Sequence, residues 1–292
     1  MNNPLFISVI VPFRNARKNI EECVQSLMDQ DFPKDRYEII LVDNDSRDGG
    51  GDLLKKHPNL VLLKEKKTGC AAARNQAVRA AKGNVLAFTD SDCVAEPRWL
   101  DHLAKAFESE KAFAVAGEIK AYQPASKIEL QYEELMAQKA NLSYACPYAV
   151  TANVAFRKSV FDEIGFFEET FLATSDVDFS WRLEHAGYSI HYQPEAVVYH
   201  KNVKTRWRLF KKTFLQSFYA PRVIKKNISY VKSRGKLMRV WIYPYVTLIK
   251  NTIRLILPKT QGKEQLLRDT VVLSARKLGR LCGSLRYGFL YL

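Results

Sequence analysis

Short apolar runs alternate with helix-like segments over the first 90 residues, and this alternation constrains the fold most. The runs cover residues 6–11, 38–42, 60–63 and 84–89. The segments between them cover residues 18–30, 51–56 and 69–81. Strands that alternate with helices at this spacing predict an α/β domain with a mainly parallel, doubly wound sheet. Farther along we expect helices over 97–109 and near 126–140, and strands over 112–116 and 196–199.

Polar clusters follow three of the predicted strands at the points where the strands end. These clusters are Arg14–Asn15, Asp43–Ser46 and Asp90–Asp92. In open α/β sheets, ligands bind at the carboxyl ends of the strands. The three clusters therefore predict one site at this edge of the sheet.

Asp90-Ser91-Asp92 is the cluster with the clearest chemistry. Two carboxylates two residues apart offer the hard oxygen ligands that Mg²⁺ and Mn²⁺ prefer, and these ions take further ligands from substrate phosphates. The alternative is an Asx turn that caps the next helix. The position after a buried strand favours the metal site.

The charge is divided very unevenly along the chain. The formal net charge of +14 arises from −6 over residues 1–200 and +20 over residues 201–292, where Glu264 and Asp269 are the only acids. This division predicts a catalytic domain over 1–200 and a basic appendage over 201–292. A basic appendage of this kind is expected to bind a polyanion.

Two basic stretches of the appendage carry apolar residues at helical spacing. Residues 206–226 contain Trp207, Phe210, Phe214 and Phe218, and residues 271–289 contain Val271, Leu278, Leu281, Leu285 and Phe289. Helices of this kind lie in a membrane interface and bind anionic headgroups. Residues 237–257 are mostly apolar but carry three basic residues and a proline, so we expect a shallow interfacial segment. The alternatives are a plain helical extension packed on the body and, least favoured, a nucleic-acid-binding surface, for which no motif is present.

Cysteine usage and the N-terminus bear on location. The five cysteines are scattered and form no C-x-x-C pair, which argues for a reducing compartment. The short apolar run at Leu5–Val11 lacks the basic lead-in of a signal peptide. We therefore expect a cytoplasmic protein associated peripherally or monotopically with the membrane.

The order of the motifs resembles that of the family 2 inverting glycosyltransferases of the GT-A fold. The resemblance runs over about residues 6–200. It rests on the following segments: Val9–Asn15, Leu41–Ser46, Gly69 to Arg74-Asn75, Thr89–Asp92, Thr151–Asn153, Phe161–Phe167, Ser175–Phe179 and Gly187 to His200. It implies a GT-A fold, Rossmann-like, with helices on both faces of the sheet, followed here by the basic helical extension. It also implies a divalent metal, Mn²⁺ or Mg²⁺.

The resemblance assigns a donor site to the strand ends. Pro12, Asp43 and Asn44 would line the nucleobase pocket, with the Asn44 amide paired to a base edge. Arg74 would face the donor pyrophosphate or sugar, since a forked cation suits phosphate oxygens. Asp92, supported by Asp90, and His200 would hold the metal. The remaining donor-site residues would be Arg14, Asp45, Gly69 and Ser91.

Asp176 is the residue that the resemblance implies as catalytic base. Inverting transfer needs one carboxylate to take the acceptor hydroxyl's proton, and no protein nucleophile. Asp178 is a competitor that could instead cap its own helix. We place Asp178 and Asn153 on the acceptor side, with a buried structural role as the alternative for Asn153. Relatives usually carry Glu-Asp where this chain has Ser175-Asp176, so no role is assigned to position 175.

The expected activity is transfer of a sugar from a nucleotide-diphosphate sugar, with UDP as the first choice of nucleotide. The acceptor would be a hydroxyl of a glycan or a polyprenyl-linked glycan. The expected partners thus include an anionic membrane surface but no nucleic acid. One alternative is a non-catalytic nucleotide-sugar-binding or scaffold relative. Another is a nucleotidyltransferase, which would favour a Gly- and Lys/Arg-rich loop that Pro12–Asn15 lacks.

Overall fold

The computed structural model describes residues 5–57, 59–123, 138–142, 146–201, 205–233 and 263–289. The chain divides into two compact units, Met1–Asn202 and Val203–Leu292, and each is described by itself. Of the helix expected near 126–140, only α6 (Gln138–Leu142) includes described residues. The segment 237–257 lies outside them.

The first unit is built on a mixed sheet of eight strands in the order β3-β2-β1-β4-β7-β6-β8-β5. Its strands are β1 (Ile7–Phe13), β2 (Tyr37–Asp43), β3 (Leu60–Lys64), β4 (Val85–Thr89), β5 (Cys93–Ala95), β6 (Ala114–Ala121), β7 (Asn153–Arg157) and β8 (Ile190–His200). The neighbouring pairs among β1 to β4 are parallel, as is β6 with β8. β7 is antiparallel to β4 and β6, and β5 is antiparallel to β8. The predicted α/β class is confirmed, while β5 and β7 were not among the predicted strands.

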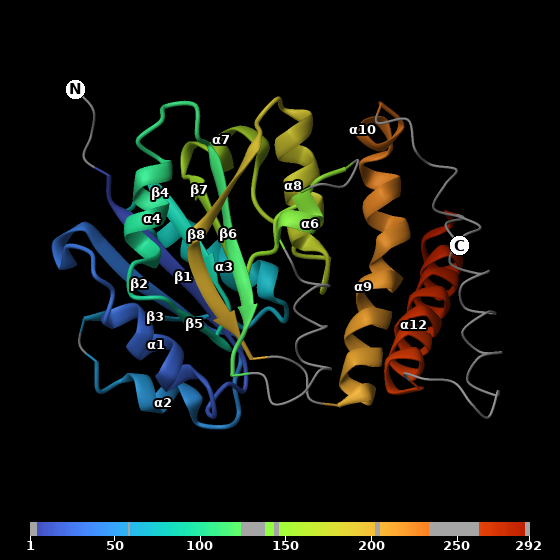
Figure 1. Cartoon of the computed structure of the whole chain (residues 1–292), viewed down its shortest axis with the longest axis horizontal. Coiled ribbons are helices and arrows are strands. Elements are labelled where there is room, and N and C mark those ends of the chain that lie inside the picture. Colours follow the sequence, from blue (N-terminus) through green and yellow to red (C-terminus); the bar gives the residue numbers. More distant parts are fainter. Residues whose placement is uncertain are drawn as a thin grey trace. The chain divides into compact units, whose positions relative to one another are not determined.

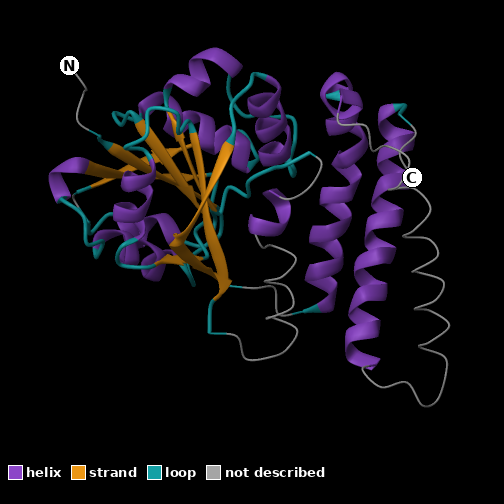
Figure 2. Ribbon diagram, turned by 45° about the horizontal axis from the view of Figure 1, so that its top comes forward, coloured by secondary structure: helices purple, strands orange, loops and turns teal. Residues whose placement is uncertain are grey.

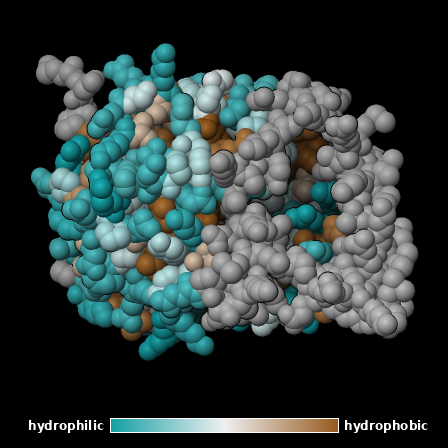
Figure 3. Space-filling model, in the orientation of Figure 1, coloured by the Kyte–Doolittle hydropathy of each residue, from teal (hydrophilic) through white to brown (hydrophobic). Residues whose placement is uncertain are grey.

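Helices cover both faces of this sheet (Figures 1 and 2). They are α1 (Ile20–Met28), α2 (Gly50–Leu54), α3 (Cys70–Ala80), α4 (Trp99–Ala106), α7 (Ser159–Ile164) and α8 (Ser175–His185), with a short 3₁₀ turn at Lys34–Arg36. One core cluster joins α1 and α4 to the sheet, and the other joins α3, α7 and α8 to its opposite face. β1 supplies both clusters because alternate residues of a strand point to opposite faces, Val9 to one and Ile10 to the other. The described surface seen in Figure 3 is mostly hydrophilic.

The register of the sheet brings the polar clusters together. Phe13 of β1 lies opposite Asp43 of β2, and β4 runs parallel to β1 toward the same edge. β8 returns to this edge, where its last residue His200 lies opposite Cys93 of β5. The carboxyl ends of four strands therefore meet beside Asp90–Asp92.

The second unit contains α9 (Arg206–Lys226), α10 (Ile228–Ser233) and α12 (Lys263–Tyr287). The two helices expected from the sequence are confirmed as helices, and they lie side by side (Figure 1). Glycines permit the close approach, since a Cβ at Gly279 would lie 2.5 Å from the Phe214 carbonyl oxygen and one at Gly283 would lie 2.1 Å from that of Phe218. None of the described helices has the length and apolar character needed to cross a membrane.

Candidate active site

The loops that follow β1 and β2 are bound to each other at the carboxyl edge of the sheet. Asn15 and Asp45 both adopt left-handed backbone conformations, with φ of 51° and 59°. The Asn15 backbone N–H donates to Ser46 Oγ at 3.0 Å. In return, the side-chain oxygen Asn15 Oδ1 accepts from the Arg47 backbone N–H at 2.8 Å. Asp43 Oδ1 accepts from the Ser46 N–H at 2.8 Å, which closes the turn over Asp43–Ser46. This wall of the site is therefore fixed by local polar contacts.

Two further predicted donor residues lie on β1 and just beyond it. Pro12 is buried within the strand, and Arg14 is exposed beyond its end. Pro12 has no N–H to donate, and the pairing of β1 with β4 ends before it, at Ile10 and Phe88. Of these two residues, Arg14 is the one whose side chain reaches solvent.

Asn44 is buried and its amide is occupied by the protein backbone. Its Nδ2 donates to the carbonyl oxygens of Glu65 and Lys67 at 3.0 and 2.7 Å, and its Oδ1 accepts from the Gly69 N–H at 2.9 Å. Both amide hydrogens are used, so Asn44 Nδ2 has no hydrogen left to donate to a base edge. Asn44 instead holds the loop from Glu65 to Gly69 against β2. Gly69 adopts φ 127°, a conformation that an L side chain rarely adopts.

Arg74 of α3 and Asp90, which directly follows β4, form a close ion pair. Arg74 Nη2 lies 2.9 Å from Asp90 Oδ1, and only 5% of Arg74 is exposed. Arg74 is therefore not a solvated helix residue. Its guanidinium faces the carboxylate that ends β4. In the described part of the chain neither Asp90 nor Asp92 accepts a backbone N–H through its carboxylate, so the Asx-turn alternative does not describe them.

Asp92 and His200 form the second close pair, on the far side of Ser91. His200 Nε2 lies 3.6 Å from Asp92 Oδ1, and ligand atoms of Asp92, Cys93 and His200 all lie within 4.8 Å of one another. His200 is buried, and its Nδ1 has no hydrogen-bond partner. The His200 Nε2 atom and a half-exposed carboxylate within this distance offer a nitrogen and an oxygen ligand, a pair that fits a divalent cation. Cys93 was not predicted here, because the three-residue strand that aligns it with His200 has too weak a sequence signal.

Asp176 begins α8 on the side of the site formed by α3. Burial raises the pKa of its carboxyl, and Asp90 adds to this, while the Arg74 guanidinium and the Val177 N–H oppose it. The Val177 N–H bond to Asp176 Oδ1 is 3.0 Å long. Thr174, two residues earlier, has a left-handed φ of 67°, which is a strained conformation for a β-branched residue. The structure thus brings Asp176 into the electrostatic environment of Arg74 and Asp90.

Asn153 and Asp178, which the sequence analysis places on the acceptor side, both lie in the interior of the first unit. Both are fully buried. Asn153 Oδ1 accepts from Trp99 Nε1 at 2.8 Å, and Asn153 Nδ2 donates to two strand carbonyls. Asp178 Oδ2 pairs with Arg182 Nε at 3.0 Å, one turn along α8. Asn153 therefore has the buried structural role that was its alternative, and Asp178 forms an ion pair within α8.

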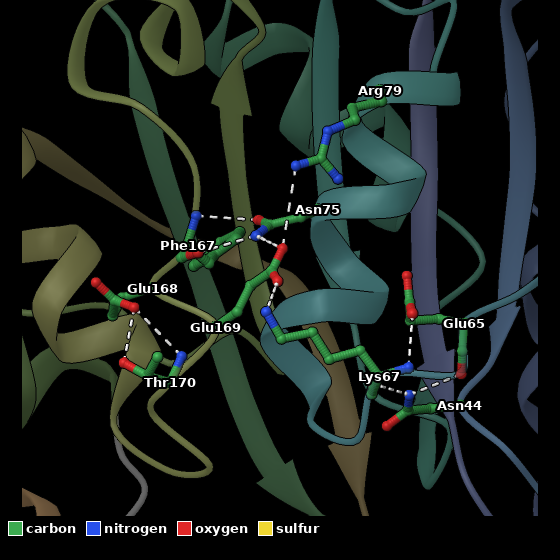
Figure 4. Close-up of polar contacts among 9 residues, drawn as sticks. All are labelled: Asn44, Glu65, Lys67, Asn75, Arg79, Phe167, Glu168, Glu169 and Thr170. Carbon is green, nitrogen blue, oxygen red and sulfur yellow. Dashed lines mark hydrogen bonds and ion pairs between the residues drawn. The ribbon is translucent and has the colours of Figure 1, made fainter.

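Asn75 and Glu169 lie next to this site and were missed by the sequence-based prediction. Asn75 follows Arg74 on α3, and its side chain binds the segment that leads to Asp176 (Figure 4). The available signal was the Arg74-Asn75 dipeptide within the recognised motif. Its partner Glu169 lies in a loop with no pattern of its own.

A mixed α/β sheet with paired carboxylates, a buried arginine and a histidine at its carboxyl edge defines a GT-A-type transferase. The chain belongs to glycosyl transferase family 2, whose family model matches residues 8–165.

Two relatives show how far the similarity extends. Glycosyltransferase AglE of Haloferax volcanii is 29% identical over 217 residues, which cover 72% of this chain and 71% of AglE. A dolichyl N-acetyl-α-D-glucosaminyl phosphate 3-β-D-2,3-diacetamido-2,3-dideoxy-β-D-glucuronosyltransferase of Methanococcus voltae is 24% identical over 274 residues, or 82% and 78% of the two chains.

Two solved structures share the fold at lower identity. The mannosyltransferase PcManGT of Pyrobaculum calidifontis, in complex with GDP-Man and Mn²⁺, has a TM-score of 0.64 and 20% identity, with 97% of this chain and 88% of that chain covered. A fragment of S. aureus TarS in complex with UDP-GlcNAc has a TM-score of 0.56 and 17% identity, with 99% and 93% covered.

Proposed function

We propose that this chain is an inverting glycosyltransferase that moves a sugar from a nucleotide-diphosphate sugar to a hydroxyl of a glycan or lipid-linked acceptor. The observation that carries the proposal is the Asp176 carboxyl, its pKa raised by burial, beside the Arg74–Asp90 pair. A general base works best when its pKa approaches the working pH. The non-catalytic alternative has less support, because the lost acid at Ser175 leaves Asp176 in place.

In the proposed reaction, Asp176 takes the proton of the acceptor hydroxyl. The hydroxyl oxygen forms its bond to the anomeric carbon as the bond from that carbon to the nucleotide diphosphate breaks. Arg74 holds Asp90 in place through their ion pair. Its positive charge also opposes the rise in the pKa of Asp176. Pro12, Arg14, Asp43, Asp45, Gly69 and Ser91 line the donor side, and Asn44 shapes it through the loop it holds.

Asp92 and His200 would hold the divalent metal, with Asp90 in support. When bound, Mn²⁺ or Mg²⁺ supplies positive charge that stabilises the departing diphosphate. The closeness of His200 Nε2 to the half-exposed Asp92 carboxylate supports this assignment. The Mn²⁺ present with PcManGT is a further argument for the same class of ion.

The nucleotide and the acceptor are proposed from the relatives. UDP is our first choice, on the strength of the TarS complex, while the PcManGT complex holds GDP-Man. The dolichyl phosphate acceptor in the name of the Methanococcus voltae relative supports a lipid-linked acceptor here. Thermal shifts of the protein with UDP, GDP and TDP sugars, compared with one another, will show which nucleotide base the donor site binds.

We propose that residues 203–292 bind an anionic membrane surface at the cytoplasmic face. α12 exposes Leu278, Leu281 and Leu285, and α9 exposes Trp207. They lie among the basic residues of a segment, 201–292, with a net charge of +20. The full-length protein should float with phosphatidylglycerol vesicles but not with phosphatidylcholine vesicles. Leu281→Ser/Leu285→Ser should weaken flotation. Equal flotation of the variant and wild type would remove these leucines from the interface.

The catalytic proposal is tested by donor hydrolysis and transfer with Mn²⁺. Asp176→Asn should lose activity by about 10³-fold or more, because the variant has no general base to accept the proton of the acceptor hydroxyl. Nucleotide binding, measured by calorimetry, should persist. EDTA should abolish activity and Mn²⁺ should restore it. If Asp176→Asn retains full activity, the base has been assigned wrongly.

A further inference from the structure

We propose that Glu169, held between Asn75 and Lys67, is a positioning residue that fixes the turn presenting Asp176 to the acceptor. The inference rests on the proposed function, because it assumes that Asp176 is the base. It assigns a purpose to Glu169, Asn75 and Lys67, which are not among the proposed donor and metal residues. Its members are drawn in Figure 4.

Asn75 binds the backbone of Phe167 in both directions. Its Nδ2 donates to the Phe167 carbonyl oxygen at 2.9 Å, and its Oδ1 accepts from the Phe167 N–H at 3.0 Å. The second Nδ2 hydrogen goes to Glu169 Oε1 at 2.8 Å. Asn75 is 1% exposed, so these bonds form where water does not compete. The segment after α7 is thereby fixed to α3.

Glu169 joins this segment to a second loop. Its Oε2 pairs with Lys67 Nζ at 2.6 Å, and Arg79 Nη2 lies 4.0 Å from its Oε1. Hydrogen bonds from Asn75 and then Lys67 lower the pKa of the Glu169 carboxyl. It therefore stays charged at neutral pH and keeps its cationic partners. A carboxylate with two hydrogen-bond donors and a second cation nearby is a stronger link than a single exposed ion pair.

The loop that carries Lys67 is itself anchored to the sheet. Asn44 holds its backbone at Glu65, Lys67 and Gly69. The Lys67 N–H also donates to Glu65 Oε1 at 2.7 Å. A continuous set of hydrogen bonds therefore runs from β2, through the loop before α3, to Glu169 and the segment that enters α8.

The turn at the end of this segment needs such support. Thr174 is held at φ 67° immediately before α8, and a β-branched residue keeps that conformation only where its surroundings impose it. Phe167 and Phe171 are buried on the way to the turn. They anchor the segment on the core side, while Glu169 anchors it on the outer side. Loss of the outer anchor would let the turn relax and move Asp176.

The test compares Glu169→Gln and Glu169→Ala with wild type in steady-state transfer. Glu169→Ala should lower kcat by roughly 10- to 100-fold, the cost of a displacement of about 1 Å at a reacting group, with the donor KM within about two-fold of wild type. Glu169→Gln should recover part of the loss, because it can still accept from Asn75. The matched control is Asp101→Asn, which removes another carboxylate held by two cations, Arg98 and Lys105 at 2.7 and 3.0 Å on α4.

A double-mutant cycle separates positioning from general destabilisation. If Glu169 acts through Asp176, adding Glu169→Ala to Asp176→Asn should cost nothing further in residual activity. An additive loss in the double variant, or a loss in Glu169→Ala no larger than in Asp101→Asn, overturns the inference. In either case the proposed function still stands if Asp176→Asn alone is inactive.

Hydrogen exchange of the full-length protein supplies a readout that does not depend on activity. Amides of residues 167–177 should exchange at least about ten-fold faster in Lys67→Met, a variant of an exposed side chain that breaks only the ion pair. Unchanged exchange in this segment refutes the anchor even if the Glu169 variants fail to fold.

Discussion

Replacing Asn153 by alanine should destabilise the first unit without acting directly on the reaction. The Asn153 side chain makes three hydrogen bonds of 2.7–2.8 Å, with Trp99 Nε1 and the carbonyl oxygens of Glu118 and Ala196. These partners belong to α4, β6 and β8, so one amide joins three elements. Glu118 and Ala196 lie at the irregular pairing of β6 with β8, where the register shifts between Gly117 and Glu118.

The size of the effect follows from the number of buried groups left without a partner. Each lost hydrogen bond costs about 1 kcal/mol, so Asn153→Ala should cost roughly 3 kcal/mol, and more if the Trp99 N–H stays unpaired. For a unit of about 200 residues, this lowers Tm by roughly 6–12 °C. A water molecule that fills the vacated space would bring the decrease in Tm toward the lower end of this range, about 6 °C.

The assay is thermal unfolding of the full-length protein, followed by tryptophan fluorescence, together with steady-state kinetics at 25 °C. Asn141→Ala is the matched control, because Asn141 is also buried but its side chain accepts one hydrogen bond, from the Tyr148 hydroxyl at 3.0 Å. It should lose about 1 kcal/mol. Asn153→Ala should keep the wild-type acceptor KM while folded. A raised acceptor KM with an unchanged Tm would refute the structural role and return Asn153 to the acceptor side.

Three further predictions follow from the same geometry. Gly69→Ala should weaken nucleotide-sugar binding measured by calorimetry, because φ 127° strains an alanine; Gly187→Ala, at φ 91° with open space around it, should leave binding unchanged. Gly283→Ala should lower the Tm of the second unit, since its Cβ would meet the Phe218 carbonyl oxygen at 2.1 Å, whereas Arg286→Ala should not. The Glu169 carboxylate contributes its full stabilisation of the fold at pH values above its ordinary, unfolded-state pKa. This stabilisation is lost as the pH falls through the lowered pKa of the folded state. The Tm advantage of wild type over Glu169→Gln should therefore shrink as the pH falls below the ordinary glutamate pKa of about 4.3.

The sequence was sufficient for the parallel half of the sheet, and the reason is physical. β1, β2 and β4 are buried on both faces, so their apolar runs are nearly continuous. β7 begins with Asn153, whose polar side chain is buried only because three distant elements satisfy it. No local pattern predicts a partner of that kind. The Asp178–Arg182 pair, by contrast, has the i,i+4 spacing that a helix prediction could have used.

The same comparison separates two kinds of polar residue around the site. Asn44, Asn75 and Asn153 are each at most 4% exposed, and each binds backbone groups through its side-chain amide. The side chains of Asp90 and Asp92 remain 32% and 38% exposed, and Asp176 is half-buried. An amide can satisfy a buried carbonyl and a buried N–H at once without the desolvation cost of a charge, which suits it to hold irregular loops. A carboxylate enclosed in the same way would have no lone pair left for a metal or a proton. Substituting the amides should therefore change stability and loop order first, and substituting Asp92 or Asp176 should change activity at nearly constant stability. Asp90 differs from these two aspartates, because its loss would also leave the buried Arg74 guanidinium without its partner.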